Sequence, residues 1–349
     1  MRKGFRFILF TLSPFLLIFL YNLIFGACDF YLQRSIRNQI SFLDREISTG
    51  GDVELQRRYP EGMLFANALL SLSIVEWDQR PSRKNEFYAS IVDRCINRIK
   101  SRTCTNGFTE NLEIKYGAFY NGWLNYIRKE YMGSDLFQYS QYQDSIFQNY
   151  KKTSAQLAYL VKDSIFLIDS YRDAAWPGDN LVCIASLGEE YQELKREWLN
   201  SVFQLSETGA NLIHHFDSRP AEARGSSLAL MQYFISQIDT SMLSPFVASY
   251  DASFKEDLFG MQMVREHRVG GKEDYDSGPI INGYGAVATI VNIKGQAAIK
   301  NKKAFSSWRR LNAVTAPINM FSKKYYIFQQ EVMFDLFMLW NAIEIQKNN

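Results

Sequence analysis

Residues 61–77 read EGMLFANALLSLSIVEW, a glutamate followed by apolar and small residues over the length of a four-turn helix. Five further stretches of this kind follow at intervals of about 50 to 60 residues, and each begins with Gly or Gln. They are GAFYNGWLNYI (117–127), GDNLVCIASL (178–187), GSSLALMQYFI (225–235), GPIINGYGAVATIV (278–291) and QQEVMFDLFMLWNAI (329–343). A more amphipathic stretch precedes each one. The repeat predicts an all-α fold, an (α/α)6 toroid of six helical hairpins.

The amphipathic stretches are expected to form the outer helices of these hairpins. They cover residues 29–45, 83–100, 134–171, 191–205, 242–258 and 302–314. Strand signals are scarce, and only the loop 259–276 is expected to hold a short hairpin, around Gly270-Gly271. No Pro-rich or Ser-rich linker divides the chain. We therefore expect a single toroid domain over residues 29–349.

The N-terminal segment 1–28 carries a targeting signal. Basic residues precede an apolar run from Phe7 to Ala27, which has roughly the 20 residues needed to span a bilayer. An uncleaved signal anchor, a lipoprotein signal and a cleaved signal peptide all fit this pattern. Phe25-Gly26-Ala27-Cys28 resembles a bacterial lipobox, with lipid attached at Cys28. Each alternative places the main domain in the periplasm, and the first two tether it to the bacterial inner membrane.

Composition narrows the classes of partner. The 349 residues are 47% hydrophobic and 15% aromatic, enough for a substantial core and for a sugar-binding surface. The net charge of +2 argues against nucleic acid. No metal-binding motif is present, and we expect no cofactor. A Cys95–Cys104 disulfide would require the intervening helix to break near Ser101.

Trp176-Pro177-Gly178-Asp179-Asn180 opens the third apolar stretch. Asp179 is suited to capping a helix N-terminus, and it is equally suited to act as a base or nucleophile, because the helix dipole stabilises its anion. Glu61 occupies the corresponding place on the first apolar stretch. All six apolar helices would point the same way, so their N-terminal ends would surround one mouth where a site is expected.

A second carboxylate motif precedes the fifth apolar stretch. Asp276-Ser277-Gly278-Pro279 gives a sharp turn, and Asn282 and Tyr284 follow. Asp276 would lie on the same mouth as Asp179. Two carboxylates with room for a water between them have the geometry of an inverting glycosidase.

Arginine and aromatic residues complete the candidate site. Arg224 stands immediately before an apolar helix, where it would either form a salt bridge with Asp179, Asp276 or Glu222 or bind an anion. Tyr116, Tyr120 and Trp123 are spaced i, i+4, i+7 and so share one helix face. That face could stack against a sugar, and it could equally be aromatic core. Arg265-Glu266-His267 are further polar candidates.

The hairpin periodicity resembles the six-hairpin (α/α)6-toroid superfamily. RYPEG, WPGDN, ARGSS and DSGPIINGYG also look similar to motifs of a bacterial membrane-anchored family of unassigned activity. The superfamily includes glycoside hydrolases, polysaccharide lyases and enzymes similar to linalool dehydratase-isomerase. The resemblance implies architecture over residues 29–349, but fold alone does not give function.

The leading hypothesis is a periplasm-facing glycoside hydrolase. Asp179 and Asp276 would be the catalytic pair, with Glu61 as a third carboxylate. The substrate-binding residues would be Arg224, Asn180, Trp176, Tyr116, Tyr120, Trp123, Tyr284 and Asn282. Helix N-termini and Arg224 would favour an anionic oligo- or polysaccharide. A lyase of uronate-containing glycan, with Tyr120 or Tyr284 as base, and a non-catalytic glycan-binding or envelope assembly protein are the alternatives.

Overall fold

The computed structural model describes residues 16–24, 29–77, 85–163, 167–204, 215–217, 219–273, 277–315, 317–320, 323–326 and 331–348. The chain is predominantly helical over these residues, which confirms the predicted helical fold class. Every predicted apolar stretch contains a helix. These six helices are α4 (Gly62–Trp77), α7 (Gly117–Met132), α9 (Pro177–Ser186), α11 (Gly225–Ile238), α13 (Ala286–Ala298) and α15 (Val332–Lys347).

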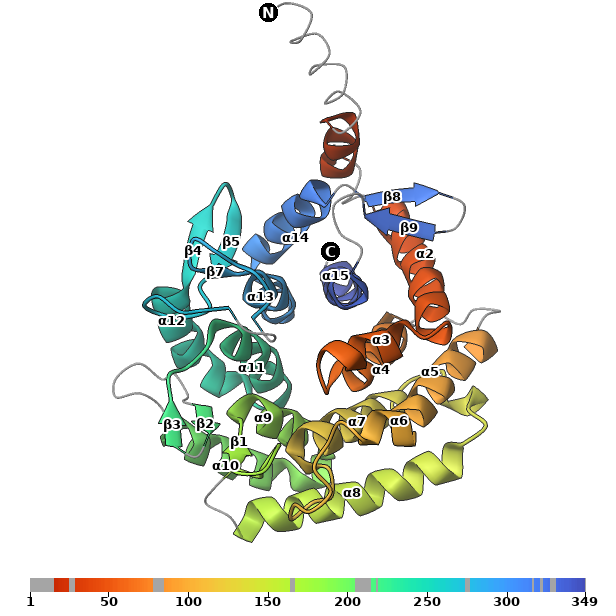
Figure 1. Ribbon diagram of the computed structural model, residues 1–349, viewed down its shortest axis with the longest axis vertical. Coiled ribbons are helices and arrows are strands. Elements are labelled where there is room, and N and C mark those ends of the chain that lie inside the picture. The colour runs from red at the N-terminus through yellow and green to blue at the C-terminus, as the bar shows by residue number, and fades with distance from the viewer. Residues whose placement is uncertain are drawn as a thin grey trace, which may run out of the picture.

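The six helices contact one another in cyclic order, and we call them the inner ring. Each packs against the next along the chain, and α15 packs against α4, so the two ends of the domain meet. The outer helices lie around them in chain order (Figure 1). They are α2 (Asp29–Ser48), α5 (Asn85–Ile99), α8 (Gln143–Asp163), α10 (Gln192–Gln204), α12 (Leu243–Phe254) and α14 (Lys302–Val314).

Sequence explains which helices lie inside. Helix α4 is apolar on all sides and is buried over nearly its whole length, as a helix surrounded by others must be. The outer helices α5 and α14 each have one apolar face, which they turn toward the ring. Pro245 lies in the first turn of α12, where its missing N–H has no helical partner to lose, so it does not disturb the helix.

The centre of the inner ring is filled by aromatic side chains. Trp123 of α7 contacts Phe65 of α4 at 5.0 Å, Phe234 of α11 at 5.6 Å and Trp340 of α15 at 6.4 Å between ring centroids. Trp123 has no exposed surface, so it belongs to the core.

Short helices and hairpins connect the main helices. The helical pieces are α3 (Gly51–Arg58), α6 (Arg102–Thr105), η1 (Phe137–Tyr139), η2 (Glu189–Tyr191) and η3 (Thr240–Met242). An antiparallel three-stranded sheet contains β1 (Ala174–Ala175), β2 (His215–Asp217) and β3 (Arg219–Ala221). Three hairpins pair β4 (Lys255–Leu258) with β5 (Met261–Val264), β6 (Ile280–Ile281) with β7 (Tyr284–Gly285), and β8 (Pro317–Met320) with β9 (Lys323–Tyr326).

Several predictions of local structure were wrong. The outer stretch expected over 242–258 is helical only to Phe254 and continues as strand β4, and the stretch expected over 134–171 has no helix at residues 167–171. The hairpin expected around Gly270-Gly271 instead turns at Phe259-Gly260, where both residues have positive φ (51° and 74°). Helix α13 begins at Ala286 rather than at 278, because Asn282 and Gly283 (φ 53° and 84°) form the turn of the β6–β7 hairpin. Asn-Gly is a strong signal for this type of turn.

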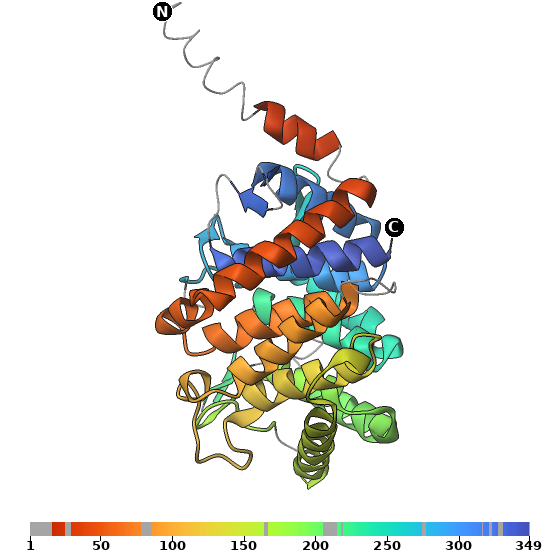
Figure 2. The same ribbon diagram turned by 90° about the vertical axis from the view of Figure 1, so that its right-hand side faces the viewer.

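The N-terminal prediction lies mostly outside the described residues. Residues 16–24 form a helix that stands apart from the inner ring (Figure 2). Among the described residues, no helix has the length and apolar character needed to cross a membrane. Cys28 is not among them. Cys95, Cys104 and Cys183 are buried free thiols, so the possible Cys95–Cys104 disulfide is not formed.

Candidate functional site

The N-terminal ends of the inner helices lie on one side of the molecule, which we call the mouth. Helix α9 fixes a loop there through its first turn. Asn180 accepts a hydrogen bond from the N–H of Ile168 (2.8 Å) and donates one to the carbonyl of the same residue (2.9 Å). Asp179 accepts a hydrogen bond from Ser170 Oγ at 2.5 Å. Asp179 is only 6% exposed, so in this structure it supports the loop from beneath.

The same loop carries the residue that contacts Glu61. Tyr171 follows Ser170 directly, and its hydroxyl donates a hydrogen bond to Glu61 Oε1. The Tyr171 ring packs against Trp176 at 5.6 Å and stacks on Phe108 at 6.4 Å. Glu61 and Asp179 are therefore linked through two consecutive residues of one loop. Glu61 is partly exposed, unlike Asp179, and it has aromatic neighbours.

The junction between this loop and α7 requires glycine. Gly117 has φ +75°, and a Cβ atom there would lie 2.2 Å from the carbonyl oxygen of Ser170. The preceding residue, Tyr116, also adopts the left-handed conformation (φ 74°). Its ring is half-buried against Tyr120 at 5.0 Å, and the Tyr120 hydroxyl donates to the carbonyl of Ile99. Of the three aromatic residues expected to share one helix face, Tyr116 is the one with appreciable exposure, since Tyr120 is 6% exposed and Trp123 is buried.

Arg224 is paired with Glu266, a residue distant in sequence. Its Nε donates to Glu266 Oε1 at 2.8 Å, and Ser226 Oγ donates to the same oxygen at 2.7 Å. Glu266 is fully buried, and burial raises the pKa of its carboxyl above the usual value although Arg224 and Ser226 act to lower it. Its second oxygen, Oε2, receives no hydrogen bond from the described residues. The positive charge of Arg224 is thus matched by a carboxylate inside the protein.

Tyr284 lies in a separate surface cluster beside the β6–β7 turn. Its hydroxyl donates to Glu256, and the guanidinium of Arg265 lies 4.9 Å from its ring centroid and 3.1 Å from Glu256 Oε2. The hydrogen bond to Glu256 raises the pKa of Tyr284. Asn282 is an exposed turn residue. Asp276 lies outside the described residues.

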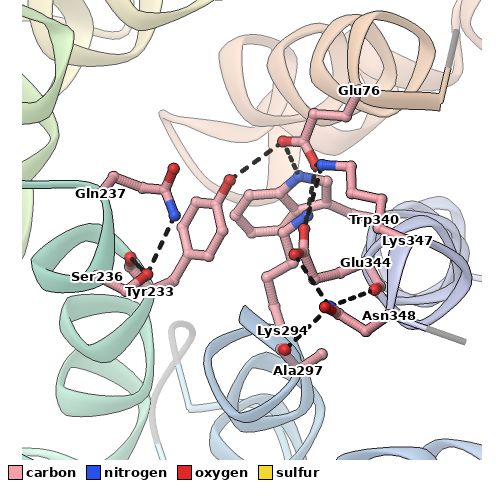
Figure 3. A network of polar contacts seen from close by, with 10 residues as sticks. All are labelled: Glu76, Tyr233, Ser236, Gln237, Lys294, Ala297, Trp340, Glu344, Lys347 and Asn348. Atoms are coloured by element: carbon pink, nitrogen blue, oxygen red, sulfur yellow. Dashed lines mark hydrogen bonds and ion pairs between the residues drawn. The ribbon is translucent and has the colours of Figure 1, made fainter. Parts of the chain in front are cut away.

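A second polar cluster, at the C-terminal ends of the inner helices, was missed by the sequence reading (Figure 3). Glu76 of α4 accepts bonds from Lys294 of α13 (2.5 Å), Lys347 of α15 (3.2 Å) and Trp340 Nε1 (2.9 Å). Glu344 of α15 binds the same two lysines, at 2.8 and 3.3 Å. We call Glu76, Lys294, Glu344 and Lys347 the ionic network.

The ionic network is charge-balanced, and all of its members except Lys347 are buried. The Lys294 side chain has no exposed surface, and its Nζ lies 4.5 Å from the Trp340 ring centroid and 4.9 Å from that of Tyr233. Burial alone raises the pKa of Glu76, but the charges of Lys294 and Lys347 outweigh it and hold that pKa at about 2. The sequence held one signal of this network, the charged residue Glu76 inside an apolar helix, because a buried charge requires an oppositely charged or hydrogen-bonding partner. The network ties three inner helices together.

No cluster of His, Cys, Asp or Glu suited to a metal occurs among the described residues. A comparison with protein-family models finds no match, and a comparison with curated proteins finds no significant match. The inference about function therefore depends on the mouth itself.

Proposed function

We propose that the inner ring and its outer helices form an (α/α)6 toroid, and that the chain is a carbohydrate-active enzyme of the bacterial envelope, a glycoside hydrolase facing the periplasm. The segment 1–28 would tether it to the inner membrane. The cyclic contacts of the inner helices and the outer position of the amphipathic helices support the toroid.

The environment of Glu61 carries the catalytic part of this proposal. Glu61 is a partly exposed carboxylate at the start of an inner helix, and it accepts a hydrogen bond from Tyr171, whose ring packs against Trp176. Glycosidases place a carboxylate of this kind beside aromatic surfaces that stack on sugar rings. Asp179, bound to the same loop, is the second carboxylate, and Asp276 is the third candidate.

In this scheme the two carboxyl groups divide the chemistry. Hydrolysis requires one protonated carboxyl to donate to the leaving oxygen, while the other, ionised, activates water or attacks the sugar. Glu61 is the accessible partner for substrate. Asp179 would reach substrate by exchanging its hydrogen bond with Ser170, and otherwise acts by holding Tyr171 in place.

A neutral glycan fits better than the anionic one expected from sequence. Arg224 is matched by Glu266, so it brings no spare positive charge to the mouth. The lyase alternative needs a tyrosine that loses its proton readily, whereas burial raises the pKa of Tyr120 and the bond to Glu256 raises that of Tyr284. These observations favour the hydrolase over the lyase.

The test compares Glu61→Gln and Asp179→Asn with the wild type on neutral oligosaccharides, by product chromatography and by binding. Glu54→Gln, an exposed residue of α3, is the matched control. Loss of a general acid or base lowers turnover by about 10²–10⁴-fold, so E61Q should fall in that range and still bind sugar. Unchanged turnover in E61Q would refute the assignment. Bound sugar with no turnover in any form would favour a non-catalytic glycan-binding protein.

A further inference from the structure

A polar groove runs along helix α5 on the outer wall of the fold, and one of its lining residues, Met63, lies two positions after Glu61. It has a volume of about 800 Å³, within the range of ligand sites in proteins. Helix α5 forms its floor from Glu86 to Arg98, which corresponds to about 18 Å of helix. Residues of α3 and α6 close one end, and the segment after η1 forms a rim. We call it the α5 groove.

The rim of the α5 groove presents two aromatic rings. Tyr139 and Tyr142 are 40% and 45% exposed, and among the described residues neither ring contacts another aromatic ring. Exposed tyrosines in a concave polar site present flat apolar faces with a hydrogen-bonding end. They are suited to stack against the apolar faces of pyranose rings.

The rim is held to α5 by a buried carboxylate. Asp93, which is 5% exposed, accepts hydrogen bonds from Ser140 Oγ (2.7 Å) and from the backbone N–H of Gln141 (3.1 Å). Ser140 Oγ in turn accepts from the N–H of Tyr142 at 3.1 Å. The two tyrosines are thus positioned before any ligand arrives, which reduces the entropy lost on binding.

The two arginines of the α5 groove are already paired with carboxylates, and Glu86 and Asp93 add negative charge to its lining. Arg98 donates from Nε to Asp52 Oδ2 at 2.7 Å, and Asp52 is fully buried. Arg94 pairs with Asp44. Neither arginine offers an unmatched charge to a phosphate or a uronate. By contrast, the exposed side chain of Asn97 has no hydrogen-bond partner among the described residues, and it can bond to hydroxyl groups.

We propose that the α5 groove binds a neutral oligosaccharide as a second glycan site. The amide of Asn97, the stacking rings, the paired arginines and the carboxyl groups of Glu86 and Asp93 all favour this class of ligand over an acidic polymer. The inference extends the proposed function, but it requires only binding. In an enzyme of the cell envelope, such a site would hold a long chain on the protein while the mouth acts on it.

The experiment measures binding of the full chain in detergent to cellohexaose, maltohexaose and chitohexaose by calorimetry, with hexagalacturonate as the charged comparison. Tyr139→Ala/Tyr142→Ala is the test variant, and Tyr159→Ala, at an exposed tyrosine of α8, is the matched control. Loss of two stacking contacts should weaken binding of a neutral hexasaccharide about tenfold or more, with no change in Tyr159→Ala.

Three results would overturn the proposal: no binding of the neutral probes, equal affinity in the double variant, or preference for hexagalacturonate. Circular dichroism confirms that the surface substitutions leave the fold intact. Turnover of a short substrate separates the two proposals, because it should depend on Glu61 and be the same in Tyr139→Ala/Tyr142→Ala. The groove can therefore fail while the mouth assignment stands, and the reverse also holds.

Discussion

Replacing Lys294 by Met should strongly destabilise the protein, because this lysine is the centre of the ionic network. The substitution keeps much of the volume but leaves Lys347 as the one network cation for both Glu76 and Glu344. Both carboxylates are 8% exposed. Breaking a buried pair by removing one partner typically costs about 3–5 kcal/mol, and we expect a loss in that range.

The pKa of Glu76 gives the direction of the pH dependence. Burial alone would raise it, but the charges of Lys294 and Lys347 hold it below the ordinary value of 4.5. A depressed carboxyl pKa stabilises the folded state above pH 4.5, and this contribution is lost as pH falls from about 4.5 to about 2. In Lys294→Met the same carboxyl should titrate at higher pH.

Urea denaturation from pH 7 to pH 3 measures both effects. Lys152→Met, on the exposed surface of α8, is the matched control and should stay within about 0.5 kcal/mol of the wild type. Lys294→Met should unfold at a lower urea concentration at pH 7, and its stability should begin to fall at a higher pH. Wild-type stability in Lys294→Met at neutral pH would refute the view that this network holds α4, α13 and α15 together.

Two further predictions concern the mouth and the thiols. Gly225→Ala should lower stability by several kcal/mol and disturb the Arg224–Glu266 pair, because its Cβ would lie 1.9 Å from the carbonyl oxygen of Arg265. Gly178→Ala should be tolerated, because its Cβ would meet only Met231 Cε at 3.9 Å. Equal thermal melts for the two variants would contradict this prediction. Burial raises the pKa values of Cys95 and Cys104 to about 12, so both thiols should resist iodoacetamide at pH 8 in the native protein and react after unfolding. Mass spectrometry of peptides would measure the alkylation. Rapid alkylation of the native protein would contradict the burial of these thiols.

Sequence periodicity predicted most of the helices, because inner and outer helices differ in their sequence pattern. An inner helix, buried on all sides, is apolar throughout, whereas an outer helix has apolar residues on one face only. The outer stretch 302–314 matches α14, and the start expected at Gly117 matches α7. The start of α13 was missed by eight residues because the Asn282-Gly283 turn was read as part of an apolar helix. A turn signal inside an apolar run should therefore take precedence over the run.

The partners of the polar residues could not be predicted in the same way. Arg224 was expected either to bind an anion or to pair with Asp179, Asp276 or Glu222. Its partner is instead Glu266, which lies 42 positions away. Lys294 and Glu76 are 218 positions apart. A buried charge indicates that a partner must exist, whereas only the packing of distant helices decides which residue it is. For the same reason, a helix-capping and a catalytic role were predicted for Asp179 with equal weight, and its contact with Ser170 was not predicted.

The most direct test of the proposed function is a crystal structure of Glu61→Gln soaked with the neutral hexasaccharide that the wild type cleaves fastest. We predict sugar density at the mouth, with a ring stacked on Trp176 or Tyr171 and the scissile oxygen within hydrogen-bonding distance of the residue 61 side chain. Density confined to the α5 groove, or an empty mouth at saturating sugar, would contradict the assignment of the mouth as a hydrolase site.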